Sequence, residues 1–145
     1  MPKALSEAYR EKIGMPIYQA WGMTETSPVA SAGHIKSTLV AGRSEEELAD
    51  LRASIGVPIA GVDLRIVDPD SLEPVAADGT TQGELQARGS WIAATYYDDE
   101  RAAESFTDDG WLKTGDVATI DEHGYMRIVD RTKDVVKSGG EWIST

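Results

Sequence analysis

Residues 62–66 read Val-Asp-Leu-Arg-Ile, and this short stretch decides how the second half of the chain is expected to fold. Its first, third and fifth residues are apolar, while Asp63 and Arg65 between them are charged. Successive side chains of a strand point to opposite faces, so the alternation places the apolar residues on one face. The stretch therefore predicts a β-strand with one buried and one solvated face.

Further strands are expected downstream. Residues 83–88 form a candidate strand after a loop that contains Asp-Pro-Asp and Ala-Asp-Gly. Residues 116–121 and 125–130 flank Glu-His-Gly and predict a hairpin, whereas Asp99 is suited to cap a helix that ends at Phe106. This part of the chain is therefore predicted to be mainly antiparallel β.

The first part of the chain shows helical signals instead. Residues 2–12 predict a helix that starts with a proline and ends before Gly14, and residues 16–20 follow as a short buried strand. A helix, a strand and a glycine-containing loop in this order are typical of a parallel α/β layer. The predicted fold class is α+β: a remnant of a parallel α/β layer followed by an antiparallel β subdomain.

A loop and a short helix are expected to join these two parts. Residues 29–43 are interpreted as the loop, and Ser44 with Glu47 forms a capping box for a helix that ends at Arg52. The chain opens directly on a helix and stops at Thr145 soon after a Gly-Gly pair. Both ends look cut, so we expect an internal fragment of a larger protein.

Composition excludes several classes of function. The net charge of −11 over 145 residues argues against a nucleic-acid surface, which needs clustered Lys and Arg. The two acidic runs, 45–50 and 98–109, are interpreted as solvated faces because they lack the spacing of a calcium loop. The absence of cysteine excludes disulfides and thiolate sites. No transmembrane segment or signal peptide is predicted, and a cytoplasmic protein is the expectation.

One loop carries residue types that suit a nucleotide site. Residues 19–26 read Gln-Ala-Trp-Gly-Met-Thr-Glu-Thr. Gly22 lets the backbone approach a ligand, the Thr24 hydroxyl can donate to a phosphate oxygen, and the Glu25 carboxylate can hold Mg²⁺. The same residues are also consistent with a tight turn and a helix cap.

Three later segments carry weaker signals when each is taken alone. Residues 83–89 are most simply a structural strand, and residues 111–116 place Asp116 in a turn that leads into a strand. Residues 130–144 are a charged linker, a short strand and a glycine turn.

In this order and spacing, the four segments resemble the adenylate-forming (AMP-binding) superfamily of acyl-CoA synthetases, luciferases and peptide-synthetase adenylation domains. The Gly-Gly-Glu-Trp-Ile-Ser wording of residues 139–144 is most similar to bacterial medium- and long-chain fatty acyl-CoA synthetases. The resemblance implies a barrel-like, distorted β subdomain and the domain division 1–40, 41–130 and 131–145. The last segment would be the hinge and the start of a C-terminal domain.

The resemblance also implies roles for individual residues. Trp21 would stack on adenine, Thr24 would contact the α-phosphate, and Glu25 would be the Mg²⁺ ligand. Asp116 would accept hydrogen bonds from the ribose, and Arg131 would bind ribose and phosphate oxygens. The implied catalytic residues are Thr24, Glu25 and Lys137, and the implied nucleotide-binding residues are Gln19, Ala20, Trp21, Gly22, Met23, Thr24, Asp116, Arg131, Lys133 at the hinge, and Trp142.

The implied reaction joins a fatty acid to ATP as an acyl adenylate and then passes the acyl group to CoA. Its implied small-molecule partners are ATP or AMP, Mg²⁺, CoA and the fatty acid. The family's phosphate loop has no match in this chain, so the chain alone is expected to be inactive. A non-catalytic binding module and an enzyme that adenylates an amino or aryl acid stay open as alternatives, as do the acyl chain length and the oligomeric state.

Overall fold

The computed structural model describes residues 2–100, 102–131, 135–138 and 141–144, and for the last two ranges it describes the backbone only. Two α-helices and nine strands are interspersed with three short 3-10 turns in the described ranges. The helices and turns are α1 (Lys3–Ile13), η1 (Thr24–Thr26), η2 (Ser37–Leu39), α2 (Glu45–Arg52) and η3 (Ala102–Ser105). The strands are β1 (Ala20–Gly22), β2 (Val29–Ala32), β3 (Val57–Pro58), β4 (Val62–Val67), β5 (Gly83–Gly89), β6 (Leu112–Ile120), β7 (Met126–Arg131), β8 (Val135–Ser138) and β9 (Glu141–Ser144).

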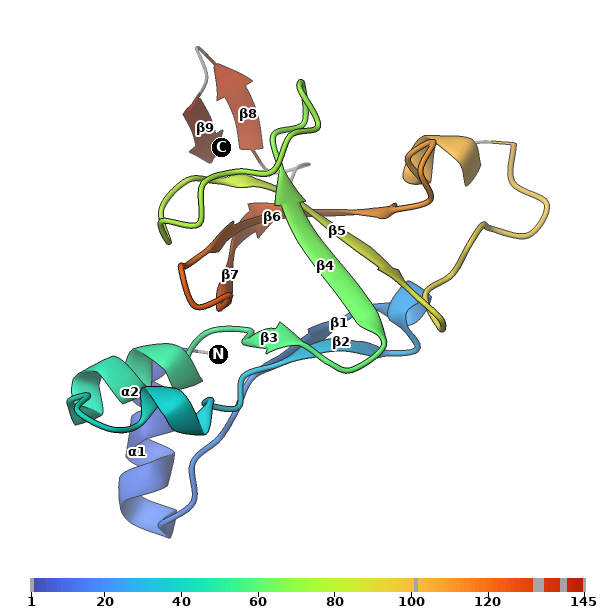
Figure 1. Ribbon diagram of the computed structural model, residues 1–145. Coiled ribbons are helices and arrows are strands. Elements are labelled where there is room, and N and C mark those ends of the chain that lie inside the picture. Colours follow the sequence, from blue (N-terminus) through green and yellow to red (C-terminus); the bar gives the residue numbers. More distant parts are fainter. Residues whose placement is uncertain (1, 101, 132–134, 139–140, 145) are drawn as a thin grey trace.

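The strands form three antiparallel sheets. The first has the order β1-β2-β3, the second β4-β5-β6-β7, and the third is the β8–β9 hairpin. Figure 1 shows the first sheet beneath the second, with α1 and α2 packed together at one end of the molecule. A bridge between Gly56 and Met126 connects the first two sheets. The predicted α+β class is therefore confirmed.

The antiparallel half follows the predicted pattern closely. Strand β4 pairs with β5 along its whole length, from Val62 opposite Gly89 to Val67 opposite Glu84. Strands β6 and β7 form the predicted hairpin, although β6 begins earlier than expected, at Leu112. Apolar residues of β1, β2, the segment before β3 and the second sheet bury one shared core; its buried members are Trp21, Ala30, Ile55, Val62, Ile66, Leu85, Ala118 and Met126.

The first half departs from the predicted layout. Residues 16–20 were expected to be a buried strand, but β1 begins only at Ala20, and Tyr18 is exposed. The Ile17 carbonyl accepts a hydrogen bond from Ser6 Oγ of α1, so the start of this segment is tied to the helix, and only its end, from Gln19 on, joins the β1–β2 pairing through the amide of Gly33. Strand β1 pairs antiparallel with β2, and the described ranges contain no parallel pair.

Two further local predictions were wrong. The expected loop 29–43 contains β2 and η2, because the small buried residues Ala30 and Ser31 fit β2 between β1 and β3. The expected helix 99–106 is reduced to the 3-10 turn η3. Phe106 instead forms a β-bridge with Leu112, which draws the end of this segment towards β6.

Candidate nucleotide site

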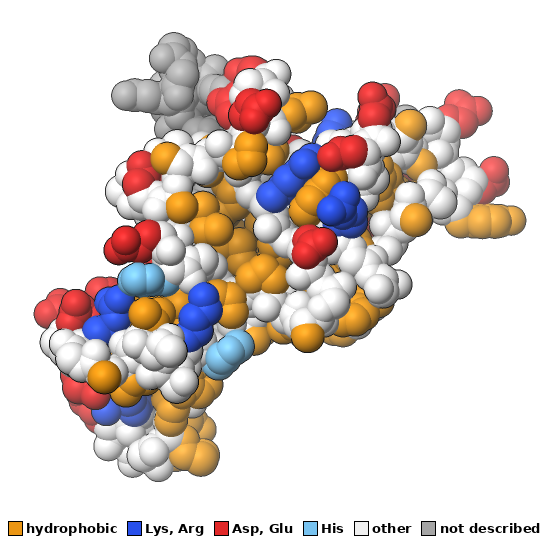
Figure 2. Space-filling model, viewed as in Figure 1, with side chains coloured by type: hydrophobic (Ala, Val, Ile, Leu, Met, Phe, Trp, Pro, Cys, Tyr) orange, Lys and Arg blue, Asp and Glu red, His pale blue; other side chains and the backbone are white. Residues whose placement is uncertain are grey.

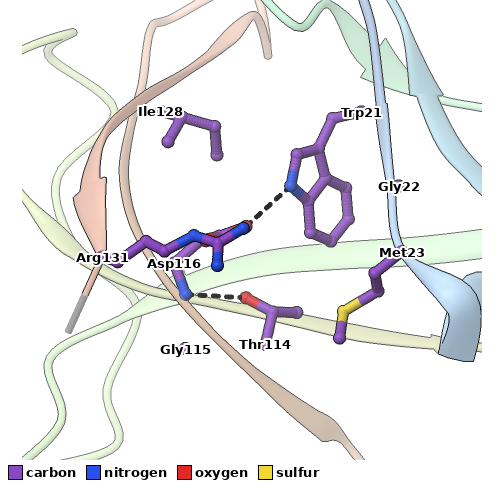
Figure 3. Close-up of a pocket in the computed structure, with 8 residues that line it drawn as sticks. All are labelled: Trp21, Gly22, Met23, Thr114, Gly115, Asp116, Ile128 and Arg131. Carbon is purple, nitrogen blue, oxygen red and sulfur yellow. Dashed lines mark hydrogen bonds and ion pairs between the residues drawn. The ribbon is translucent and has the colours of Figure 1, made fainter. Parts of the chain in front are cut away.

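A cavity of about 360 Å³ lies where the two larger sheets meet. Figure 3 shows side chains from three strands turned towards it: Trp21 from β1, Asp116 from β6 and Arg131 from β7. Gly22 and Met23 complete the first wall, and Thr114, Gly115 and Ile128 complete the others. The fold therefore brings together residues from three of the four segments that the sequence singled out.

Asp116 is the central polar group of this cavity. Its side chain is 12% exposed, and its Oδ2 accepts a hydrogen bond of 2.8 Å from the indole Nε1 of Trp21. Arg131, opposite Asp116 in the β6–β7 ladder, brings its Nε to 3.5 Å from Oδ1. The Arg131 side chain is 75% exposed, so this ion pair is open to competition by solvent or a ligand.

The backbone that carries Asp116 is also fixed by side-chain contacts. The amide of Asp116 donates to Thr114 Oγ1, which in turn donates to the carbonyl of Leu85 on β5. Gly115 between them adopts a φ of 74°, which a residue with a Cβ would resist. Thr114 and Gly115 thus shape the site although the sequence had marked only Asp116 as a binding residue.

Trp21 is both a core residue and a wall of the cavity. Its side chain is only 9% exposed and packs among Ala30, Ile55 and their neighbours. It also lines a second cavity of about 430 Å³, together with Gln19, Ala20 and Ile128. Two of the predicted binding residues, Gln19 and Ala20, therefore lie at this second cavity and not at the first. Gln19 also donates from Nε2 to the carbonyl of Ala53.

Thr24 and Glu25 belong to the turn η1 beside the first cavity, but neither lines it. Glu25 is held by the segment after β5: its carbonyl accepts from the amide of Ala93, and its Oε1 accepts a 2.6 Å hydrogen bond from the hydroxyl of Tyr96. That hydrogen bond, with burial and the nearby negative charge, raises the pKa of Tyr96 to about 12. The phenol is therefore a donor at neutral pH, a partnership that the sequence had not indicated.

The remaining predicted residues lie in the last segment. Lys137 and Trp142 are register partners in the β8–β9 hairpin, and Lys133 lies outside the described residues. Among the described residues, no group of three or more His, Asp or Glu side chains could hold a metal ion. Glu25 alone still suits Mg²⁺, which often takes one or two carboxylates and completes its shell with phosphate oxygens and water.

The acidic runs 45–50 and 98–109 were expected to form solvated faces, and the surface agrees with that expectation. Figure 2 shows acidic side chains spread along the margins of the visible face, over the helices and the loops, with basic side chains among them. Within the ranges that the structure describes, no helix combines the length and apolar composition that a membrane span requires.

Comparison with known proteins shows the family to which the chain belongs. Residues 1–97 match the family described as AMP-binding enzyme, and the chain belongs to this family of adenylate-forming enzymes. A long-chain-fatty-acid–CoA ligase of Thermus thermophilus is 46% identical over 99% of this chain and 26% of its own length. A medium-chain-fatty-acid–CoA ligase of Ectopseudomonas oleovorans is 42% identical, again over 99% of this chain and 26% of its own length.

A solved structure gives the same result for the fold. O-succinylbenzoate coenzyme A synthetase from Bacillus subtilis, in complex with ATP and magnesium ion, superposes with a TM-score of 0.77. The two are 30% identical, over 99% of this chain and 27% of the synthetase. The chain thus spans about a quarter of the length of the relatives it matches.

Proposed function

We propose that this chain forms the adenosine-binding part of an ATP-dependent, AMP-forming acyl-CoA ligase that activates a fatty acid. The observation that carries the proposal is the cavity in which the buried Asp116 carboxylate lies between an indole N–H and a solvent-accessible guanidinium. A carboxylate with free lone pairs suits two ribose hydroxyls, and an exposed arginine beside it suits a phosphate. The similarity to the fatty-acid ligases of Thermus thermophilus and Ectopseudomonas oleovorans supports the choice of acid.

In the proposed reaction, a carboxylate attacks the α-phosphate of ATP, pyrophosphate leaves, and the acyl group then passes from AMP to the thiol of CoA. Asp116 and Arg131 bind the ribose and its phosphate, and Trp21 borders adenine. Thr24 contacts the α-phosphate. When bound, Mg²⁺ neutralises charge on the phosphates, and Glu25 is the residue of this chain that would hold it.

The last segment, residues 131–145, has a separate proposed role. Lys133 serves as the hinge, while Lys137 and Trp142 approach the nucleotide when the hinge turns. Because Lys137 and Trp142 are register partners in one hairpin, they would move together. The domain division 1–40, 41–130 and 131–145 and a cytoplasmic location belong to the same proposal.

The proposal is tested with two proteins, the chain alone and a full-length ligase that carries it. In the first, the 145-residue chain is titrated with AMP, and weak saturable binding that Asp116→Ala reduces further is expected. In the second, residues 1–145 replace the matching segment of the Thermus thermophilus ligase, and turnover is followed as pyrophosphate release with a fatty acid, ATP and CoA. The graft is expected to be active, Asp116→Ala to weaken ATP binding, and Glu25→Ala to slow the adenylation step.

The alternatives make different predictions in the same assays. A folded graft that binds no nucleotide would support a non-catalytic binding module. A gain of activity on aryl or amino acids, which the unmodified Thermus enzyme lacks, would favour the adenylation of such acids. Of the aryl and amino acids, the structural similarity to O-succinylbenzoate coenzyme A synthetase favours the aryl acids. Pyrophosphate release by the 145-residue chain alone would contradict the expectation that it is inactive.

A further inference from the structure

The indole N–H of Trp21 and the carboxylate of Asp116 meet across the boundary between the two larger sheets (Figure 3). The donor and acceptor are 2.8 Å apart, and the contact is buried. Trp21 is fixed in turn by the core, because its side chain is only 9% exposed. A donor held this firmly constrains the rotation of the carboxylate that it binds.

An aspartate carboxylate offers about four lone-pair positions. Trp21 uses one of them on Oδ2 through its hydrogen bond, and the Arg131 guanidinium lies near Oδ1 in an ion pair of 3.5 Å. As far as the described residues are concerned, about two positions stay open, which matches the two hydroxyls of a vicinal diol. The two protein contacts are unequal, since the indole is buried whereas Arg131 is 75% exposed and easily displaced.

We infer that Trp21 is a positioning residue that sets the Asp116 carboxylate for recognition of a cis-diol, and that it thereby makes the site selective for ribonucleotides over deoxynucleotides. The inference rests on the proposed nucleotide function and deepens it. Trp21 acts through Asp116, in addition to whatever its ring contributes to the cavity wall. Its hydrogen bond is therefore expected to matter only for ligands that carry the diol.

The test compares AMP with 2′,3′-dideoxy-AMP, which lacks both hydroxyls. Binding to the 145-residue chain is followed by NMR, which measures weak affinities through backbone amide shifts. The unmodified chain is expected to prefer AMP. Trp21→Phe keeps an aromatic ring but removes the N–H, and it should weaken AMP binding by about tenfold, the scale set by one hydrogen bond to a charged group. The affinity for dideoxy-AMP should stay unchanged.

Two controls isolate the effect. Trp91→Phe makes the same substitution at an exposed tryptophan that does not line the cavity, and it should alter neither affinity. In an Asp116→Ala background, Trp21→Phe should cause no additional loss, because the residue through which Trp21 acts is gone. A loss that is equal for both ligands, or that persists without Asp116, would overturn the inference and leave Trp21 a purely structural residue.

A measurement without substitution covers the case in which Trp21→Phe does not fold. The indole N–H signal of Trp21 is expected to be protected from solvent exchange and to shift when AMP is added but not when dideoxy-AMP is added. Identical shifts with both ligands would contradict the inference. Failure of the unmodified chain to bind AMP would instead contradict the proposed function, so the two failures are distinguishable.

Discussion

Glu7 of α1 forms a bidentate ion pair with Arg52 of α2, in which both carboxylate oxygens accept hydrogen bonds. Arg52 Nε donates to Oε1 at 2.9 Å and Nη2 donates to Oε2 at 3.0 Å. The Arg52 side chain is 7% exposed and that of Glu7 18%, and Oε2 also accepts from Nε of Arg10. A two-point contact of this kind is directional and fixes how the two helices pack.

Replacement of Glu7 by Gln should therefore destabilise the fold. The variant removes the two-point countercharge of the buried Arg52 guanidinium and leaves it only the longer contact to Glu45 at 3.4 Å, so we expect a loss of about 1–3 kcal/mol in the free energy of unfolding. Urea denaturation measures this loss. Glu11→Gln, the same change at an exposed position of the same helix, is the matched control and should have little effect. Equal stability of the two variants would show that the helix contact is unimportant.

The same carboxylate should make stability depend on acid pH. The hydrogen bond from Arg52, together with Arg10 and the two positive charges, lowers the pKa of Glu7 below its ordinary value of 4.5, although burial opposes the shift. Because the folded-state pKa is below the unfolded one, the stabilisation is present above about pH 4.5 and is lost as the pH falls through the folded-state pKa. The stability gap between the unmodified protein and Glu7→Gln should narrow on acidification, and a gap that widens would contradict this sign.

The Tyr96 hydroxyl should stabilise the turn that carries Glu25. Tyr96→Phe removes the donor to Glu25 Oε1, and we expect it to cost about 1 kcal/mol, the net value of a typical hydrogen bond. Tyr97→Phe is the control, since the Tyr97 side chain is 98% exposed. Denaturation curves of the two variants decide the matter: an effect at Tyr97 as large as that at Tyr96 would refute the assignment.

Substitution of two glycines should distinguish the cost of backbone strain from the cost of steric overlap. Gly42 and Gly56 have nearly equal φ values, 81° and 80°. A Cβ at Gly42 would meet open space, whereas one at Gly56 would overlap the carbonyl of Ala32. Gly42→Ala should therefore cost about 1–2 kcal/mol from the left-handed backbone alone, and Gly56→Ala should cost clearly more. Thermal unfolding of the two variants provides the comparison, and equal losses would mean that the β2 backbone moves aside.

Local patterns predicted the elements whose sequence signal is strong. The alternation in β4, the turn between β6 and β7, and the Ser44–Glu47 capping box all fold as expected, and the box is closed by hydrogen bonds in both directions. The missed strand β2 is a run of small residues with no alternation to mark it. It is a strand because its buried residues fit between two neighbours, which is a property of the tertiary packing.

The sequence motifs predicted which residues belong to the candidate site, but not how those residues contact one another. Sequence motifs indicated Trp21, Asp116 and Arg131, and the fold brings these three residues together at one cavity. The bond between Trp21 and Asp116 depends on how two sheets meet, and the partnership of Tyr96 with Glu25 depends on the path of a long loop. Neither contact has a local signature, because each joins residues more than seventy positions apart.

The distance along the chain between Trp21 and Asp116, 95 residues, has a consequence for how the molecule acquires its cavity. Hairpins such as β6–β7 close locally, on a scale of roughly 1–10 μs. The cavity walls come from strands of different sheets, and contacts of high sequence separation form slowly because loop closure must come first. We therefore expect the cavity to form late in refolding, after the local hairpins, so that nucleotide added during refolding would affect only the last approach of the two sheets.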